Sequence, residues 1–266
     1  MPTHGPRREE RLPDPRNVLV EMTLVPRTGA VIRGTQAPAP AAVPAPGAAR
    51  QIRILRTLEV DEYDPPLHAA AILPLAVPRP APPDNKFRGT SRKAAKLSIA
   101  DAPMETFNDV NDLIDSFEDH DAMVNMDIPT TAGSGRVDEE KRNVRVKAFL
   151  YAASHEDDND FHLIIGRDPS KAAKYMTAEI SGLPPRNSGA FEKLDTARSA
   201  YFEYFGDGLP GTSYDFYDPP IEIEIEGSLF WDASHAHGGR PGPQTLRPKM
   251  PVVWEIHPVT KIVFEP

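Results

Sequence analysis

The chain has no cysteine among its 266 residues, and long apolar runs are also missing. The first absence excludes disulfide bonds, thiolate metal ligands, iron–sulfur clusters and cysteine nucleophiles. The richest apolar run, residues 69–77, is broken by Pro74, whereas a helix that spans a bilayer needs roughly 18 apolar residues. No apolar stretch follows the basic start of the chain, as a secretory signal would require. We therefore expect a soluble, cytoplasmic protein with no membrane partner.

Proline, in contrast, is abundant: the chain has 30 prolines and 17 glycines, and its proline content is roughly twice the ordinary value. Alternating alanine and proline in residues 36–47, and a proline cluster in residues 74–84, predict extended linkers. We interpret the basic residues 86–96 as a solvated linker, with contact to nucleic acid or an acidic surface as the alternative. Residues 1–100 are thus predicted to be a Pro-rich, basic and partly disordered arm.

Short strands are predicted within this arm. Residues 17–33 alternate apolar with other side chains and contain a glycine turn, which predicts a β-hairpin. Residues 52–60 are rich in β-forming side chains and predict a further strand. The sequence leaves open whether residues 15–62 form a small domain of their own or add strands to a larger sheet.

Residues 101–140 form an acidic segment with an internal apolar pattern. The apolar residues that recur at spacings of three and four are Phe107, Val110, Ile114 and Phe117. This spacing predicts one short amphipathic helix within residues 104–127. The helix either packs on its own domain or presents an acidic motif to a partner. Residues 130–135 are rich in threonine, serine and glycine and predict a flexible joint.

Residues 141–266 carry a regular plan of strands. Alternation of apolar and polar side chains predicts strands at residues 144–150, 161–165, 176–180, 221–231 and 252–256, the last continued or paired by residues 261–264. Helical spacing predicts one helix at residues 189–205. Three strands, a helix and two strands is the order of an OB-fold. The predicted fold is mainly β, an OB-like five-stranded barrel with one helix between strands 3 and 4. A plain β-sandwich with a helical insertion is the alternative.

The first candidate site is a polar cluster at the strand ends. Asp158, Asp160 and His162 lie at i, i+2 and i+4, so on a strand they share one face and could bind a divalent cation together. Further oxygen and nitrogen donors are Glu179, Asp232, His235, His237, Glu255 and His257. A metal-dependent hydrolase would use such donors to activate water, with Arg145 or Arg167 beside the reacting group. In the alternative interpretation, the acidic residues form a solvated turn, and the buried donors bond to the backbone.

The second candidate site is the loop of residues 234–243, which contains two histidines, three glycines and two prolines. In an OB-fold this loop joins the fourth and fifth strands and lines the usual binding face. An ordered surface loop is the alternative. The acidic turn before residue 161 and the net negative charge of residues 141–266 oppose phosphate binding, so a protein or small-molecule ligand is favoured over nucleic acid.

Four short motifs occur in order along this region. They are Asp158-Asn159-Asp160-Phe161-His162-Leu163, Ala178-Glu179-Ile180, Gly227-Ser228-Leu229-Phe230-Trp231-Asp232 with His235, and Glu255-Ile256-His257-Pro258-Val259. They resemble the D-x-D-x-H hairpin, the acidic E-(I/V) strand, the G-x-x-F-(F/W)-D-x-x-H strand end and the terminal E-(I/L)-H-P-V motif of a family of uncharacterised bacterial proteins. The resemblance covers residues 144–264. It implies one domain there and no particular activity.

The sequence favours a binding or interaction protein whose ligand and oligomeric state are open. The predicted ligand-binding residues are His162, Glu179, Asp232, His235 and His257. The alternative is a metal-dependent hydrolase or nuclease, whose divalent metal would be the cofactor. The predicted metal ligands are Asp158, Asp160 and His162. The two hypotheses differ in a testable way, because the second requires these side chains to converge within metal-binding distance.

Overall fold

The computed structural model describes residues 12–14, 17–26, 30–33, 51–60, 84–171, 174–236 and 240–265. The linker predicted at residues 36–47, all but the last residue of the linker predicted at residues 74–84, and His237 lie outside the described residues. None of the helices in the described part of the chain has the length and apolar character that crossing a bilayer requires.

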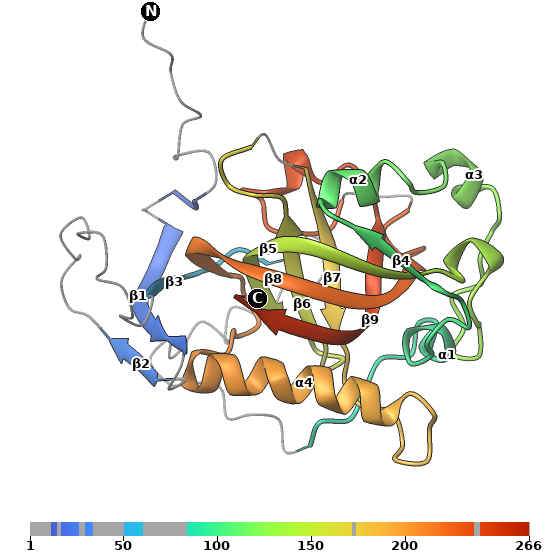
Figure 1. Cartoon of the computed structure of the whole chain (residues 1–266), viewed down its shortest axis with the longest axis horizontal. Coiled ribbons are helices and arrows are strands. Elements are labelled where there is room, and N and C mark those ends of the chain that lie inside the picture. The colour runs from blue at the N-terminus through green and yellow to red at the C-terminus, as the bar shows by residue number, and fades with distance from the viewer. Residues whose placement is uncertain are drawn as a thin grey trace, which may run out of the picture.

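Five strands of the described chain close into a ring (Figure 1). They are β5 (Asn143–His155), β6 (Phe161–Gly166), β7 (Tyr175–Ile180), β8 (Asp215–Trp231) and β9 (Trp254–Phe264). Each strand pairs with the next in the order β5–β6–β7–β9–β8, and β8 pairs with β5 to complete the ring. The β7–β9 pair is parallel, whereas the other four pairs are antiparallel. The prediction of a mainly β fold is confirmed.

Alternation along these strands builds the hydrophobic core. Within residues 221–226 of β8, the three isoleucines are buried, and the three glutamates between them are exposed or half-buried. The matching faces of β5, β6, β7 and β9 contribute to the same core, for example through Val146, Leu163, Ala178 and Ile256. Because side chains alternate between the two faces of a strand, the opposite face of β6, β7 and β9 is available to other groups.

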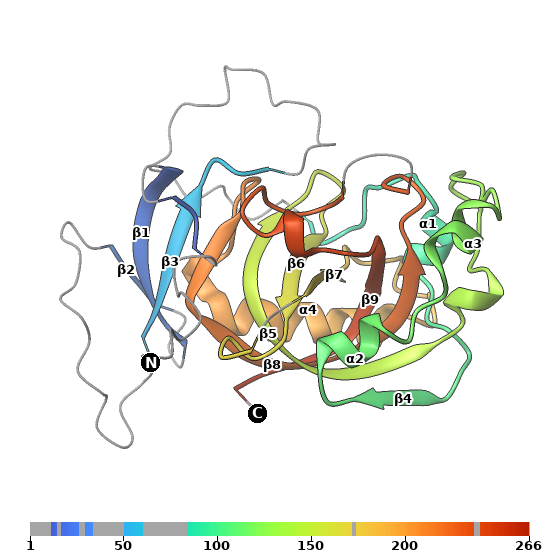
Figure 2. The same ribbon diagram turned by 90° about the horizontal axis from the view of Figure 1, so that it is seen from above.

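Four further strands extend the sheet beyond the ring. They are β1 (Val18–Val25), β2 (Ala30–Arg33), β3 (Ile52–Thr57) and β4 (Met104–Phe107). The hairpin predicted at residues 17–33 is confirmed, since β1 and β2 pair antiparallel. The first residues of the long strand β8 pair with β3, and β4 runs parallel to β5. The first three strands therefore extend the sheet of the ring. Figure 2 shows β1, β2 and β3 side by side at one end of the molecule.

The longest helix, α4 (Phe191–Phe205), lies between β7 and β8 in the chain. Ala197, Tyr201 and Phe205 bury its inner face in the core, and Tyr201 contacts Phe161 of β6. Gly206 ends the helix with a φ of 50°, a conformation that glycine adopts without strain. The number of helices differs from the prediction of one helix within residues 104–127 and one at residues 189–205, because three short helices precede the ring. They are α1 (Lys93–Lys96), α2 (Val110–Ile114) and α3 (His120–Val124).

The acidic segment is not the single helix that its spacing predicted. Phe107 lies in β4, and the following residues form two helices, each begun by an aspartate cap. The Asp109 carboxylate accepts a hydrogen bond from the Asn111 N–H, and the Asp119 carboxylate accepts one from the Asp121 N–H. Such caps satisfy the free N–H groups of a helix start, so they favour two short helices over one. Phe117 instead stacks on Trp254 of β9.

Candidate metal centre

Residues 84–100, which we call the strap, cross the ends of the ring strands. The Phe87 N–H donates to the Leu183 carbonyl at 3.0 Å, and the Arg88 N–H donates to the Asp158 carbonyl at 2.8 Å. Farther along, the Ala100 N–H donates to the Ser228 hydroxyl. The interpretation of residues 86–96 as a solvated linker is therefore wrong.

The strap is also attached to the segment predicted as a flexible joint. The Arg92 N–H donates to the Thr130 carbonyl, and the Ala94 N–H donates to the Ala132 carbonyl. The Arg92 guanidinium donates to the Gly135 carbonyl at 2.8 Å. Residues 130–135 thus hold the start of α1 in place rather than serving as a free joint.

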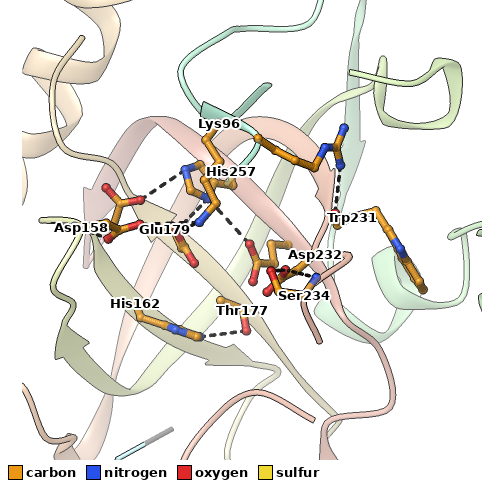
Figure 3. A network of polar contacts seen from close by, with 12 residues as sticks. Lys96, Asp158, His162, Thr177, Glu179, Trp231, Asp232, Ser234 and His257 are labelled. Carbon is orange, nitrogen blue, oxygen red and sulfur yellow. Dashed lines mark hydrogen bonds and ion pairs between the residues drawn. The ribbon is translucent and has the colours of Figure 1, made fainter. Parts of the chain in front are cut away.

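A polar face lies on β6, β7 and β9, opposite the hydrophobic core. It carries His162 on β6, Thr177 and Glu179 on β7, and Glu255 and His257 on β9. Strand register brings them together, because His162 pairs with Glu179 and Thr177 pairs with Glu255. Figure 3 shows Lys96, Asp158, Glu179 and His257 pointing toward one another, with His162 and Thr177 close by.

Asp160, Glu179 and His257 form the centre of this face, and one ligand atom from each lies within 4.8 Å of the others. His257 Nδ1 lies 2.7 Å from Glu179 Oε2, and His257 Nε2 lies 3.5 Å from Asp160 Oδ2. Glu255 Oε2 is 3.7 Å from His257 Nδ1. All four side chains are at most 2% exposed. We call Asp160, Glu179 and His257 the inner centre.

The inner centre and the adjoining Glu255 contain buried polar atoms that make no hydrogen bond of good geometry within the described part of the chain, although His257 Nδ1 and Glu179 Oε2 lie within ion-pair distance of each other. They are Asp160 Oδ2, Glu179 Oε2, Glu255 Oε2 and both ring nitrogens of His257. A buried polar atom that stays unpaired costs about 1–3 kcal/mol, and more when it is charged. The alternative in which Glu179, Glu255 and His257 bond to the backbone is therefore not what the structure contains. One ligand atom each from Asp160, Glu179 and His257 lies within 4.8 Å of the others, so the three residues could bind a single cation, with His257 using one of its two ring nitrogens.

A second set of donors adjoins the first and shares Glu179 with it. Ligand atoms of Glu156, His162 and Glu179 also lie within 4.8 Å of one another. His162 Nδ1 lies 2.6 Å from Glu156 Oε1, and His162 Nε2 lies 3.1 Å from the Thr177 hydroxyl. We call Glu156, His162 and Glu179 the outer centre, because the Glu156 side chain is 19% exposed.

Lys96 places one positive charge beside these carboxylates. Its ammonium lies 3.7 Å from Asp158 Oδ2 and 3.8 Å from Glu179 Oε2. Burial alone would lower the pKa of Lys96, but the surrounding carboxylates raise this pKa well above its ordinary value. Burial would likewise raise the pKa of Glu179, yet Lys96 and His257 hold it well below the usual range. Lys96 and Glu179 are therefore both charged at neutral pH.

Three other acids of the face have raised pKa values instead. Burial raises the pKa of Asp160 well above its ordinary value, and neighbouring carboxylates raise it further. Burial and the nearby Glu179 carboxylate do the same for the pKa of Glu255. Burial also raises the pKa of Glu156, to about 7. Lys96 thus lies among several carboxylates, and three of the acids around it have raised pKa values.

The predicted metal ligands Asp158, Asp160 and His162 do not converge as one set. Asp160 faces Glu179 and His257, whereas His162 faces Glu156 and Thr177. The strand begins only at Phe161, and Asn159 before it has a φ of 76°, so strand alternation does not extend back to Asp158. Asp158 instead accepts the Asp160 N–H with Oδ1 and pairs with Lys96 through Oδ2.

Asp232 and His235, two further predicted ligand-binding residues, pair with each other beside the face. His235 Nδ1 contacts Asp232 Oδ2, and Asp232 Oδ1 accepts hydrogen bonds from the N–H and hydroxyl of Ser234. Burial would raise the pKa of Asp232, but the His235 contact outweighs it and holds this pKa well below its usual range. These two residues line the edge of the face and do not belong to either centre.

Sequence reasoning missed Lys96 and assigned Glu156 to a solvated turn. Lys96 sits in a helix of four residues, and no periodicity links it to the strands that begin after residue 142. The position of the Glu156 side chain is set by the turn between β5 and β6, which the alternation along the strands does not describe.

A comparison of the chain with family models, with curated proteins and with solved structures found no match.

Proposed function

We propose that the chain is a binding protein built on an OB-type barrel and that its polar face binds a divalent cation. The strand order of the ring, the parallel β7–β9 pair and the position of α4 between β7 and β8 support the OB-type assignment. In that fold, the face of the second and third strands, with the loops after the first and fourth strands, is the usual ligand site. His162 and Glu179 of the two centres lie on the corresponding strands β6 and β7, Glu156 and Asp160 lie in the turn before β6, and His257 lies on β9.

One observation carries the cation assignment: buried ligand atoms of Asp160, Glu179 and His257, one from each residue, lie within 4.8 Å of one another. Two ligands of an ion bound at about 2.1 Å lie roughly 3 Å apart. His257 Nδ1 is 2.7 Å from Glu179 Oε2, and its other ring nitrogen, Nε2, is 3.5 Å from Asp160 Oδ2, so His257 would bind one ion through only one of these two atoms. One imidazole with two carboxylates favours Mn²⁺, Fe²⁺ or Zn²⁺ over Ca²⁺, which takes six to eight oxygen ligands.

Burial favours a binding role over the hydrolase alternative. A hydrolytic metal keeps an open position for water and substrate. Here the side chains of the inner centre are almost completely buried, and Lys96 of the strap lies against them. The hydrolase or nuclease stays a prediction that would require the strap to move.

Metal titration of the chelator-treated full chain tests the proposal. We expect the wild type to bind Mn²⁺ and Zn²⁺, and we expect Asp160→Asn and His257→Gln to weaken binding at least about 100-fold, because loss of a supporting group alone costs 10–100-fold. The Asp160→Asn amide keeps an oxygen that can accept the Gly182 N–H, as Asp160 Oδ1 does in the wild type. Calorimetric titration, with circular dichroism to establish folding, gives the readout.

Asp157→Asn is the matched control, because Asp157 lies in the same turn with an exposed side chain. This variant is expected to bind both ions as the wild type does. A wild-type chain that binds neither ion, or an Asp160→Asn chain that binds them as tightly as the wild type, would refute the proposed function.

A further inference from the structure

We propose that the polar face binds two divalent ions, one in the inner centre and one in the outer centre, with the Glu179 carboxylate bridging them. This inference rests on the proposed function and extends it from one ion to a pair. It follows from three features of the described residues: the position of Glu179, the orientation of His162 and the balance of charge.

Glu179 occupies the middle strand of the polar face. Its partner across the antiparallel β6–β7 pair is His162, and on the other side β9 brings His257 within 2.7 Å of its Oε2 atom. Glu179 Oε2 is buried without a hydrogen bond. A carboxylate has two oxygens that can bind separate ions, and paired metals in proteins lie about 3.5–4 Å apart. Glu179 is therefore the one residue that both centres share.

His162 is oriented as a ligand of the outer centre. The Thr177 hydroxyl lies 3.1 Å from Nε2, and Glu156 Oε1 lies 2.6 Å from Nδ1. In the tautomer that carries its proton on Nε2, this N–H donates to Thr177 and the lone pair of Nδ1 is directed at Glu156. Metal-binding histidines commonly donate their second ring N–H in this way, which fixes the tautomer and the ring plane. With that tautomer, two acceptors face each other at 2.6 Å. A proton or a cation must then lie between them.

The charge of the face can accommodate two ions. Five carboxylates line the face, and one ammonium, that of Lys96, lies among them. The carboxylates are those of Glu156, Asp158, Asp160, Glu179 and Glu255. Buried charges are stable only when they are paired. With all five carboxylates ionised, two divalent ions supply the four positive charges that Lys96 leaves unmatched, whereas one ion supplies half of them.

The two centres differ in access to solvent. The inner ligands Asp160 and His257 are fully buried, whereas part of Glu156 is exposed. The outer ion is therefore expected to exchange faster and to bind more weakly. A titration should resolve one tight and one weaker event.

The test counts Mn²⁺ ions on the full chain by equilibrium dialysis and records the electron paramagnetic resonance spectrum at each ratio. We expect two ions per wild-type chain and the broadened spectrum of a coupled pair at saturation. His162→Gln and Glu156→Gln are each expected to retain one ion with the spectrum of an isolated Mn²⁺. Glu179→Gln is expected to bind neither ion at the wild-type affinity, and Glu192→Gln, at an exposed position of α4, is the matched control.

The outcomes separate this inference from the proposed function. One ion in the wild type, retained in His162→Gln and Glu156→Gln and lost in Asp160→Asn, would overturn the ion pair and leave the inner centre intact. Two ions that persist in both outer-centre variants would also overturn it. No bound ion in the wild type would refute the proposed function itself. Glu156 is less deeply buried than His162. The Glu156→Gln variant therefore still tests the outer centre if the His162→Gln variant does not fold.

Discussion

Replacement of Arg92 by methionine is expected to lower the free energy of unfolding by about 3–5 kcal/mol. The Arg92 and Glu140 side chains are buried and form two parallel contacts of 2.6 Å and 2.7 Å. Arg92 also donates to the Trp231 carbonyl, and Glu140 accepts the Trp231 N–H, so the pair ties the strap to the end of β8. Methionine fills part of the space but leaves the Glu140 carboxylate buried without its counter-ion.

The matched control is Arg88→Met in the same strap. Arg88 is 45% exposed, and its ion pair with Asp84 is 3.5 Å long, so its loss is expected to cost at most about 1 kcal/mol. The double variant Arg92→Met/Glu140→Leu should recover most of the loss, because it removes both buried charges. Urea unfolding at pH 7 measures all four proteins. Equal midpoints for Arg92→Met and Arg88→Met would show that the buried pair contributes nothing to stability.

The position of Arg92 connects this stability to the polar face. Arg92 has a left-handed backbone, with a φ of 45°, directly before α1. Such a conformation is unfavourable for a residue other than glycine and persists only where surrounding contacts hold it. The buried ion pair supplies those contacts. It thereby fixes the start of the helix that carries Lys96 to Glu179.

The ring was predictable because its strands have strong local patterns. The isoleucine–glutamate alternation of residues 221–226 commits one face of β8 to the core, and the spacing of Leu194, Ala197 and Tyr201 does the same for α4. Both patterns act within a few residues. The order of the elements then limited the topology, because neighbouring segments tend to pair.

The same logic failed where tertiary contacts decide the structure. The apolar residues between 107 and 117 have helical spacing, yet Phe107 lies in β4, which pairs in parallel with β5. The buried pairing of Arg92 and Glu140, and the contact of Lys96 with Glu179, join residues far apart in the chain. A basic stretch rich in small residues has the composition of a linker, so no local signal separates it from a packed strap.

The candidate site was predicted in part. His162, Glu179 and His257 do lie on one face, and alternation on the strands makes this readable from the sequence. The division into two centres depends on the register of β6 against β7 and on the turn at Asn159. Register is fixed by turn geometry and core packing rather than by the polar residues themselves.

Replacement of Lys96 by methionine is expected to tighten Mn²⁺ binding by at least about tenfold, which corresponds to about 1.4 kcal/mol. The Lys96 ammonium lies 3.8 Å from Glu179 Oε2, so it repels any cation that this carboxylate binds. At an effective dielectric constant of 20, two unit charges 4 Å apart interact by about 4 kcal/mol. Proton uptake by the acids offsets part of this gain, which is why the expected effect is smaller.

The same variant should become less stable when metal is removed, because Glu179 then loses its nearest positive charge. In chelator we expect the free energy of unfolding to fall by about 1–3 kcal/mol, and saturating Mn²⁺ should restore it, since an ion that binds only the folded state stabilises that state. Lys93→Met, in the same helix with its ammonium over the Phe87 ring, is the control and should change neither quantity. If Lys96→Met binds Mn²⁺ more weakly than the wild type, Lys96 supports the ion rather than competing with it. The electrostatic account of the polar face would then be wrong.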